Sequence, residues 1–168
     1  AGHPFGIVFA LVFGAWLSQM VGDPRRTAGF AAEAERIAKD KGFSFWLPLV
    51  GFMQAWASSR ERQGDAEEAR HAEELDVMEA CIERQKSMGV RFGLMYLKFQ
   101  LAQECIAWNE PDRASDFLER TRKIRESSGE EFFEPEYERL RGQLCLLRHA
   151  HGDDPAALEE AEAHFRRS

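Results

Sequence analysis

Apolar residues recur along the chain at the three- and four-residue spacing of amphipathic α-helices. Two segments carry stripes of large side chains, Phe92, Met95, Phe99, Ala102 and Ile106 in one and Phe133, Tyr137, Leu140, Leu144 and Leu147 in the other. Two more carry lighter stripes, built from Ala28, Ala31, Ala34, Ile37 and Ala38 and from Ala114, Phe117, Leu118, Thr121 and Ile124. Long alternating runs of Val, Ile and Thr, typical of strands, do not occur. The pattern therefore predicts an all-α protein.

Turn signals divide these segments at a nearly constant interval. One series begins at Gly22, Gly64, Asn109 and Gly152, with successive separations of 42, 45 and 43 residues, and carries Asp or Pro residues that favour a helix start. A second series lies between its members, at Gly42, Gly89 and Gly129, where glycine suits the left-handed end of a helix. Self-similarity at this period predicts an α-solenoid of stacked helix pairs.

The signals predict about eight helices in one domain that covers residues 1–168. The first helix of each pair is expected near residues 4–21, 44–63, 91–108 and 132–150, and the second near 25–40, 66–87, 112–127 and 155–167. Short turns make each pair antiparallel, which gives hairpins at approximately 4–41, 43–88, 90–128 and 131–167.

The first predicted helix differs from the others because its apolar residues surround it almost completely, from Phe5 to Trp16. This pattern predicts burial on all sides, with a preceding repeat as the neighbour that an excised piece would lack. The run is shorter than the ~20 residues of a membrane span, and no basic residues precede it as in a signal peptide. The chain opens at Ala1 and stops inside a helical pattern at Ser168, so we expect a piece excised from a longer protein.

The closing residues carry a family resemblance. Residues 135–147 read PEYERLRGQLCLL, Gly152-Asp153 follows, and residues 157–167 read ALEEAEAHFRR. This stretch resembles the last repeat of the tetratricopeptide-like (TPR, MalT-like) arrays at the C-termini of bacterial multidomain signalling regulators. The segments 3–24 and 42–57 resemble earlier repeats, so the likeness extends over essentially the whole chain. The sequence departs from the pattern at Tyr137, Gln143 and Ser168.

The resemblance implies a right-handed superhelix of about four hairpins that serves as a sensor or scaffold. Such regulators join an AAA/STAND-type ATPase to an adenylate/guanylate cyclase or to a LuxR-type DNA-binding output domain. The concave face would bind a peptide, a protein or another domain of the parent. The alternative is that it senses a small-molecule effector that controls the cyclase, ATPase or transcription-regulator output.

Polar residues beside the apolar stripes of the first helices are the candidates for a partner-binding groove. They are Gln54, Tyr96, Lys98, Glu136, Arg139 and Gln143. The last three share one helix face, where Glu136 and Arg139 could equally form an intrahelical ion pair of little energetic value. Tryptophan is a favoured binding residue, but the positions of Trp16, Trp46, Trp56 and Trp108 on apolar stretches favour core packing.

Composition and motifs argue against several other functions. The net charge is −7, and the short basic clusters are interleaved with acids or lie near helix ends, so we expect no direct nucleic-acid partner. No phosphate loop, dinucleotide fingerprint or HExxH motif occurs, which predicts a non-enzymatic segment without a cofactor.

Two groups of residues could suggest metal or thiol chemistry. Cys81, Cys105 and Cys145 form no CxxC pair and suit reduced, buried thiols in a cytoplasmic protein. His149, His151, Asp153 and Asp154 have metal-binding chemistry, but their place at a helix end and the following turn favours capping roles. We therefore expect no metal site.

The apolar first helix predicts self-association. We expect the isolated chain to form a homodimer through residues 4–21, because an apolar helix left uncovered gains from pairing with a second copy. Light scattering measures this directly. A monodisperse monomer at high protein concentration would contradict the expectation.

Overall fold

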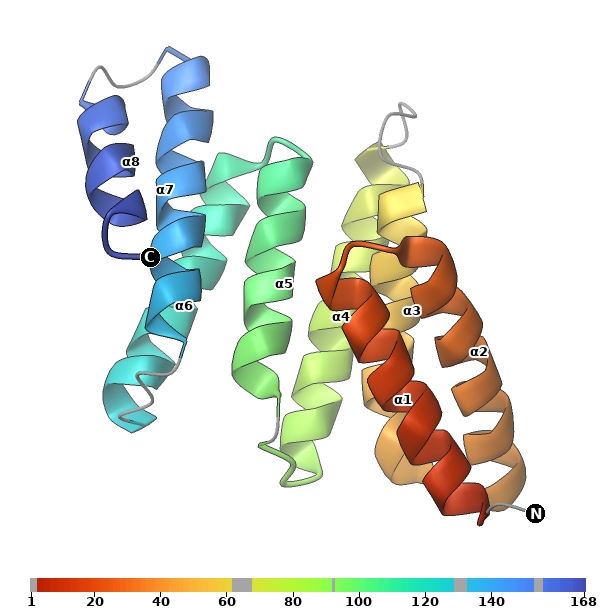
Figure 1. The fold of residues 1–168 in the computed structure, drawn as a ribbon. Coiled ribbons are helices and arrows are strands. Elements are labelled where there is room, and N and C mark those ends of the chain that lie inside the picture. Colours follow the sequence, from red (N-terminus) through yellow and green to blue (C-terminus); the bar gives the residue numbers. More distant parts are fainter. Residues whose placement is uncertain (1–2, 62–67, 92, 129–132, 153–155) are drawn as a thin grey trace. The chain divides into compact units, whose positions relative to one another are not determined.

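The computed structural model describes residues 3–61, 68–91, 93–128, 133–152 and 156–168, which are helical and contain no strand (Figure 1). The α-helices of this part of the chain are α1 (Pro4–Met20), α2 (Pro24–Lys41), α3 (Leu47–Glu61), α4 (Glu68–Ser87), α5 (Leu94–Ala107), α6 (Pro111–Ser128), α7 (Glu134–Ala150) and α8 (Ala157–Phe165). A short 3₁₀ helix, η1 (Ser44–Trp46), leads into α3. The all-α prediction with eight helices is confirmed.

The predicted turn residues have left-handed backbone conformations. Gly22, Gly42, Gly89, Asn109 and Gly152 have φ between 64° and 79°. At four of these turns the next N–H donates to the carbonyl five residues earlier, as in Asp23 to Ser18, Phe43 to Ala38, Val90 to Gln85 and Glu110 to Cys105, at 2.8–3.1 Å. These bonds satisfy carbonyls that the helix end would otherwise leave unpaired. The predicted turns at Gly64 and Gly129 lie outside the described residues.

Helix starts follow the turns closely. Pro24 and Pro111 open α2 and α6, where a missing N–H costs nothing and the fixed φ suits a helix. The Asp23 carboxylate accepts a hydrogen bond from the Arg26 backbone N–H at 3.0 Å and so caps α2. A helix can therefore end and the next begin within three residues, which makes α1 and α2 a tight hairpin.

The chain divides into two compact units, Ala1–Phe92 (unit 1) and Gly93–Ser168 (unit 2). In unit 1, α2 packs against both α1 and α3, and α3 packs against α4. The fully buried alanines Ala31, Ala34 and Ala38 give α2 a thin inner face that lets its neighbours approach closely. The large side chains of this core are Val8, Val12, Phe52, Met53, Leu75, Met78 and Ile82.

In unit 2, α5 packs against α6 and α7 against α8, while α5 and α6 both touch α7. Leu97, Phe99, Leu118, Leu140 and Leu144 form its core. The approach of α7 to α8 depends on Gly142, because a Cβ at this position would come within 2.6 Å of the Phe165 ring. Even alanine at position 142 therefore requires the Phe165 ring to move.

Helix α1 is buried on one side only, so burial on all sides does not occur within this chain. Val8, Val12 and Ala15 are buried, but Phe5 and Phe9 are nearly half exposed. The reason is that α2 and α3 cover only one side of α1, while apolar residues occupy all sides. Among the described helices none is both long and apolar enough to cross a membrane.

We predict that Leu144→Ala lowers the free energy of unfolding by about 2–5 kcal/mol, because it leaves a cavity at a fully packed position. Leu144 is 1% exposed and lies in the apolar stripe of α7. Leu146→Ala is the matched control, since Leu146 lies on the same helix and is 42% exposed. Denaturant unfolding of both variants measures the effect. Equal small losses would mean that the stripe does not form the core.

Candidate functional site

A partly open cavity of about 290 Å³ lies in unit 1, where α1, η1, the start of α3 and the end of α4 meet. The described residues that line it are Phe9, Phe13, Phe45, Trp46, Leu49, Gln85 and Val90. Its accessible wall is almost wholly carbon, and no charged side chain belongs to this set. A cavity with these walls favours an apolar occupant, because a charged group would lose its hydration there without gaining a partner.

The left-handed turns bring the lining residues together. The turn at Gly42 leads directly into η1, which returns Phe45 and Trp46 to the side of α1. At the end of α4, the N–H of Val90 donates to the carbonyl of Gln85 at 3.1 Å, so one turn places both residues. Three of the seven lining residues, Phe45, Trp46 and Val90, thus lie directly after two turns that the sequence pattern predicts.

Aromatic rings form most of the wall and continue onto the surface beside it. Phe9 and Phe13 lie one helical turn apart on α1, with ring centroids at 4.5 Å, and Phe9 meets Trp46 edge to face at 5.9 Å. Phe5 adds a further contact with Trp46 at 5.9 Å. We call Phe5, Phe9, Phe13, Phe45 and Trp46 the aromatic face. Exposed apolar clusters of this kind mark interaction sites in many proteins.

Trp46 and Gln85 are the two most deeply buried residues of the cavity wall whose side chains carry polar atoms. Trp46 is 6% exposed, and its buried indole nitrogen has no hydrogen-bond partner among the described residues. Since that nitrogen has no accessible surface, the ring presents carbon atoms to the cavity. Gln85 is 3% exposed and is the one polar side chain among the described lining residues.

The six residues predicted for a groove fall in both units. Gln54 lies on α3 in unit 1, whereas Tyr96 and Lys98 lie on α5 and Glu136, Arg139 and Gln143 on α7 in unit 2. All six are half-buried. The Gln54 amide donates to the Glu35 carboxylate at 3.0 Å, linking α3 to α2 and helping to lower the pKa of Glu35. This contact gives Gln54 a structural role.

Arg139 is the centre of a small polar cluster on α5 and α7. Its guanidinium donates twice to the Glu136 carboxylate, at 2.6 and 2.7 Å, and once to the Gln103 amide oxygen at 3.2 Å. These bonds to Glu136 raise the pKa of Arg139. The intrahelical ion pair is therefore present. Gln103 was missed by the sequence reasoning, although it lies seven residues after Tyr96 and so shares its helix face.

The tryptophans divide between core and partial exposure. Trp46 and Trp56 are buried, which confirms core packing for these two. Trp16 and Trp108 are half-buried. The Trp16 ring stacks near Phe13 at a centroid distance of 5.8 Å, so it extends the row of rings on α1.

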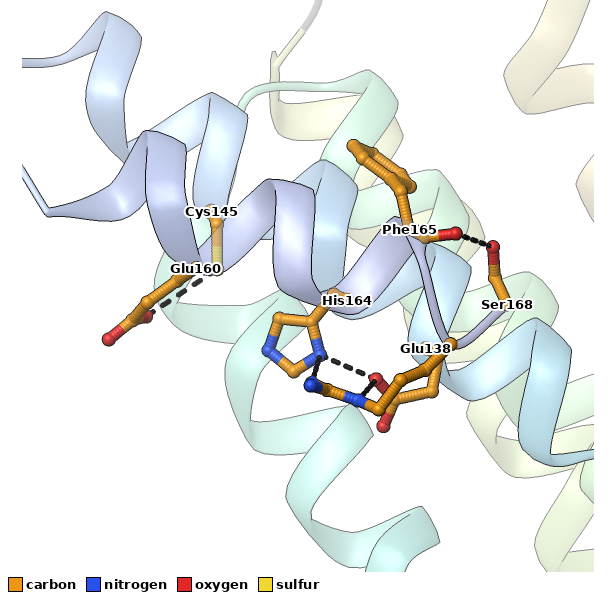
Figure 2. A network of polar contacts seen from close by, with 7 residues as sticks. Glu138, Cys145, Glu160, His164, Phe165 and Ser168 are labelled. Carbon is orange, nitrogen blue, oxygen red and sulfur yellow. Dashed lines mark hydrogen bonds and ion pairs between the residues drawn. The ribbon is translucent and has the colours of Figure 1, made fainter.

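Cys105 and Cys145 are buried and Cys81 is half-buried, and all three have the properties of unreactive thiols. Burial raises the pKa of Cys81 to about 11 and that of Cys105 to about 12, and it also raises the pKa of Cys145. The Cys145 thiol contacts the Glu160 carboxylate at 3.8 Å (Figure 2). A thiol that stays protonated near neutral pH is a poor nucleophile and a poor metal ligand.

A buried carboxylate on α7 holds the end of the chain (Figure 2). Glu138 Oε2 lies 2.8 Å from His164 Nδ1 and accepts a hydrogen bond from Arg167 Nε at 2.8 Å. Burial by itself raises the pKa of Glu138, but the hydrogen bonds from His164 and Arg167 outweigh it and hold the pKa below its ordinary value. This network ties α8 and the residues after it to α7.

Of the four residues predicted to cap helix ends, the structure describes His149 and His151. His151 Nε2 lies 2.8 Å from the Asn109 side-chain oxygen, so two turns of unit 2 are joined. Asp153 and Asp154 lie outside the described residues. Within the described part of the chain, no group of three or more His, Cys, Asp or Glu residues is placed to hold a metal ion.

The fold and the cavity define a class of protein, an all-α protein built from helix hairpins with an aromatic-walled pocket. Comparison with protein-family models, curated proteins and solved structures found no match to this chain. The likeness to tetratricopeptide arrays therefore stays a prediction from the sequence, as do the single domain and the superhelical stacking of the hairpins.

We predict that Glu138→Gln lowers the free energy of unfolding by about 1–2 kcal/mol at neutral pH, because charged hydrogen bonds to Arg167 and His164 are lost. The folded pKa of Glu138 is lowered, so its contribution is present above the unfolded value of about 4.3 and disappears as the pH falls through the folded value. The stability difference from the wild type should shrink below about pH 4. Glu162→Gln, at an exposed ion pair with Arg166, is the control. Equal losses of stability in both variants would mean that the hydrogen bonds of Glu138 contribute no more than an exposed ion pair.

Proposed function

We propose that this chain is a protein-interaction module of the helical-repeat type, in which the aromatic face of unit 1 holds an amphipathic helix of a protein partner. The observation that supports it most is the apolar cavity bordered by exposed rings. Interfaces gain most of their affinity from a few large anchors in desolvated pockets. A cavity of about 290 Å³ has room for one large apolar side chain of a partner.

The chemistry of α1 favours an apolar partner surface. Between Pro4 and Met20 the helix carries no charged residue, so it offers no ion pair to a partner. A helix that presents apolar residues at positions i, i+3, i+4 and i+7 would cover such a surface. Strand pairing is disfavoured, because the described part of the chain has no sheet edge to extend.

Charge beside the cavity favours acidic flanks on the partner helix. Arg91 directly follows the lining residue Val90, is exposed, and forms no ion pair within the described residues. A carboxylate next to the anchoring side chain could pair with this guanidinium at the rim, which would add more to the association rate than to affinity. We therefore favour an amphipathic helix with Asp or Glu on its polar side.

The proposal retains what the sequence resemblance implies about context. The partner could be a peptide, a separate protein or another domain of a larger signalling regulator, with the hairpins stacked into a right-handed superhelix. The three free thiols favour a reducing compartment such as the cytoplasm. A small-molecule effector is the second candidate, and the volume of the cavity is the observation that favours it.

Selection from a phage-displayed random peptide library on the 168-residue chain tests the proposal. We expect the enriched peptides to carry helical apolar spacing with acidic neighbours. Phe9→Glu should weaken their binding at least tenfold, because it places a charge at the cavity mouth. Leu158→Glu on α8 is the matched control, since Leu158 is 47% exposed and Phe9 is 46% exposed.

Circular dichroism melting of each variant establishes that it is folded, and Phe45→Glu replaces Phe9→Glu if the latter unfolds. Arg91→Glu should slow association and lessen its salt dependence, with a smaller effect on affinity. Peptides that bind the Phe9→Glu chain as tightly as the wild type would place the binding surface elsewhere. Peptides sensitive only to Leu158→Glu would assign it to unit 2.

A further inference from the structure

The volume of the cavity in unit 1 indicates the size of a small molecule that would fill it. An apolar protein cavity of about 150 Å³, lined by Leu, Ile and Phe, stays dry and holds one benzene molecule. The cavity in unit 1 measures about 290 Å³, close to twice that volume. Two linked or fused rings are therefore the natural size of an occupant.

The walls define the chemical character of that occupant. Phe9, Phe13, Phe45 and Trp46 offer aromatic rings, which prefer edge-to-face or offset contacts with a further ring. Leu49 and Val90 add aliphatic carbon, and no lining residue within the described chain is charged. An ionised ligand would lose hydration on entry without meeting an opposite charge, which strongly disfavours it.

The polar side of the site is limited to one buried amide. Gln85 is the polar member of the described lining set and belongs to the last turn of α4. The amide oxygen of Gln85 has no accessible surface, so the single hydroxyl or N–H of a ligand would face the open mouth of the cavity, whereas several polar groups would be buried without partners. A few placed polar groups in a mostly apolar wall are typical of small-molecule sites.

Much of the wall exists before any ligand arrives. Trp46, Leu49 and Gln85 are each more than nine-tenths buried, and the backbone bond between Gln85 and Val90 holds the end of α4. Preformed walls reduce the ordering cost of binding. A bound molecule would touch α1, η1, α3 and α4 together, and so would stabilise the packing of unit 1.

From these features we infer that the unit 1 cavity is a binding site for a small, neutral, two-ring aromatic molecule with at most one hydrogen-bonding group. The inference goes beyond the proposed function, because it needs no partner helix. A ligand in the cavity would compete with the anchoring side chain of such a helix. Small-molecule binding would then regulate the interaction surface.

The direct test uses 2-naphthol as the neutral probe and 2-naphthalenesulfonate as its charged counterpart. We expect one 2-naphthol to bind per chain in a saturable manner, and to raise Tm by several degrees at a hundredfold excess over Kd. The sulfonate should bind at least tenfold more weakly, because its charge would enter an uncharged cavity. Phenol should also bind more weakly, since one ring fills only part of the volume.

Two substitutions on the α4 side locate the probe. Val90→Trp should fill the cavity and abolish 2-naphthol binding, whereas Val77→Trp on the exposed side of α4 should leave binding unchanged. Phe45→Glu gives a second test by placing a charge at the wall if Val90→Trp fails to fold. Circular dichroism melting without ligand verifies each variant.

Several outcomes would overturn the inference. They are the absence of saturable 2-naphthol binding, equal binding by Val90→Trp, or sulfonate binding as tight as that of 2-naphthol. Binding only to a dimer, seen by light scattering with the probe present, would assign the cavity to a second copy of the chain. The peptide selection is independent of this test. Peptide binding without naphthol binding would contradict only the proposed ligand site. Naphthol binding without any selected peptide would contradict only the proposed interaction module.

Discussion

The left-handed turn that closes α1, α2, α4 and α5 is the constraint on which this structure depends. A helix end leaves carbonyls unsatisfied, and the bonds across Gly22, Gly42, Gly89 and Asn109 satisfy them within two residues of the last helical turn. Because the chain reverses so sharply, successive helices come to lie side by side. The same geometry builds the cavity, since the turn at Gly42 leads into η1 and the turn at Gly89 joins Gln85 to Val90.

Packing between the helices combines small residues with large ones. The fully buried alanines of α2 allow α1 and α3 to approach α2 closely, and Gly142 does the same where α7 meets the ring of Phe165. Polar contacts then join the helices, as Gln54 does with Glu35 in unit 1 and Glu138 with His164 and Arg167 in unit 2. Many of the polar groups with binding chemistry therefore serve the fold.

The aromatic face of unit 1 is a partly exposed apolar surface. Helix α1 has more apolar residues than α2 and α3 can cover, so Phe5 and Phe9 stay partly exposed beside the cavity. The cysteines do not add reactivity, because burial raises the pKa of each thiol. A partner helix and a two-ring ligand would both use the aromatic face.

The sequence by itself determined the helices and their turns, because both depend on local properties: the spacing of apolar residues, and the tolerance of Gly and Asn for positive φ. It also indicated core roles for Trp46 and Trp56. Tertiary structure alone decided which side of α1 is covered, that Arg139 meets Gln103, and that Phe45, Leu49 and Val90 share a cavity with Phe9. The contact of Arg139 and the cavity join residues from 36 to 81 positions apart in the chain, and periodicity within one helix contains no information about which neighbour its faces will meet.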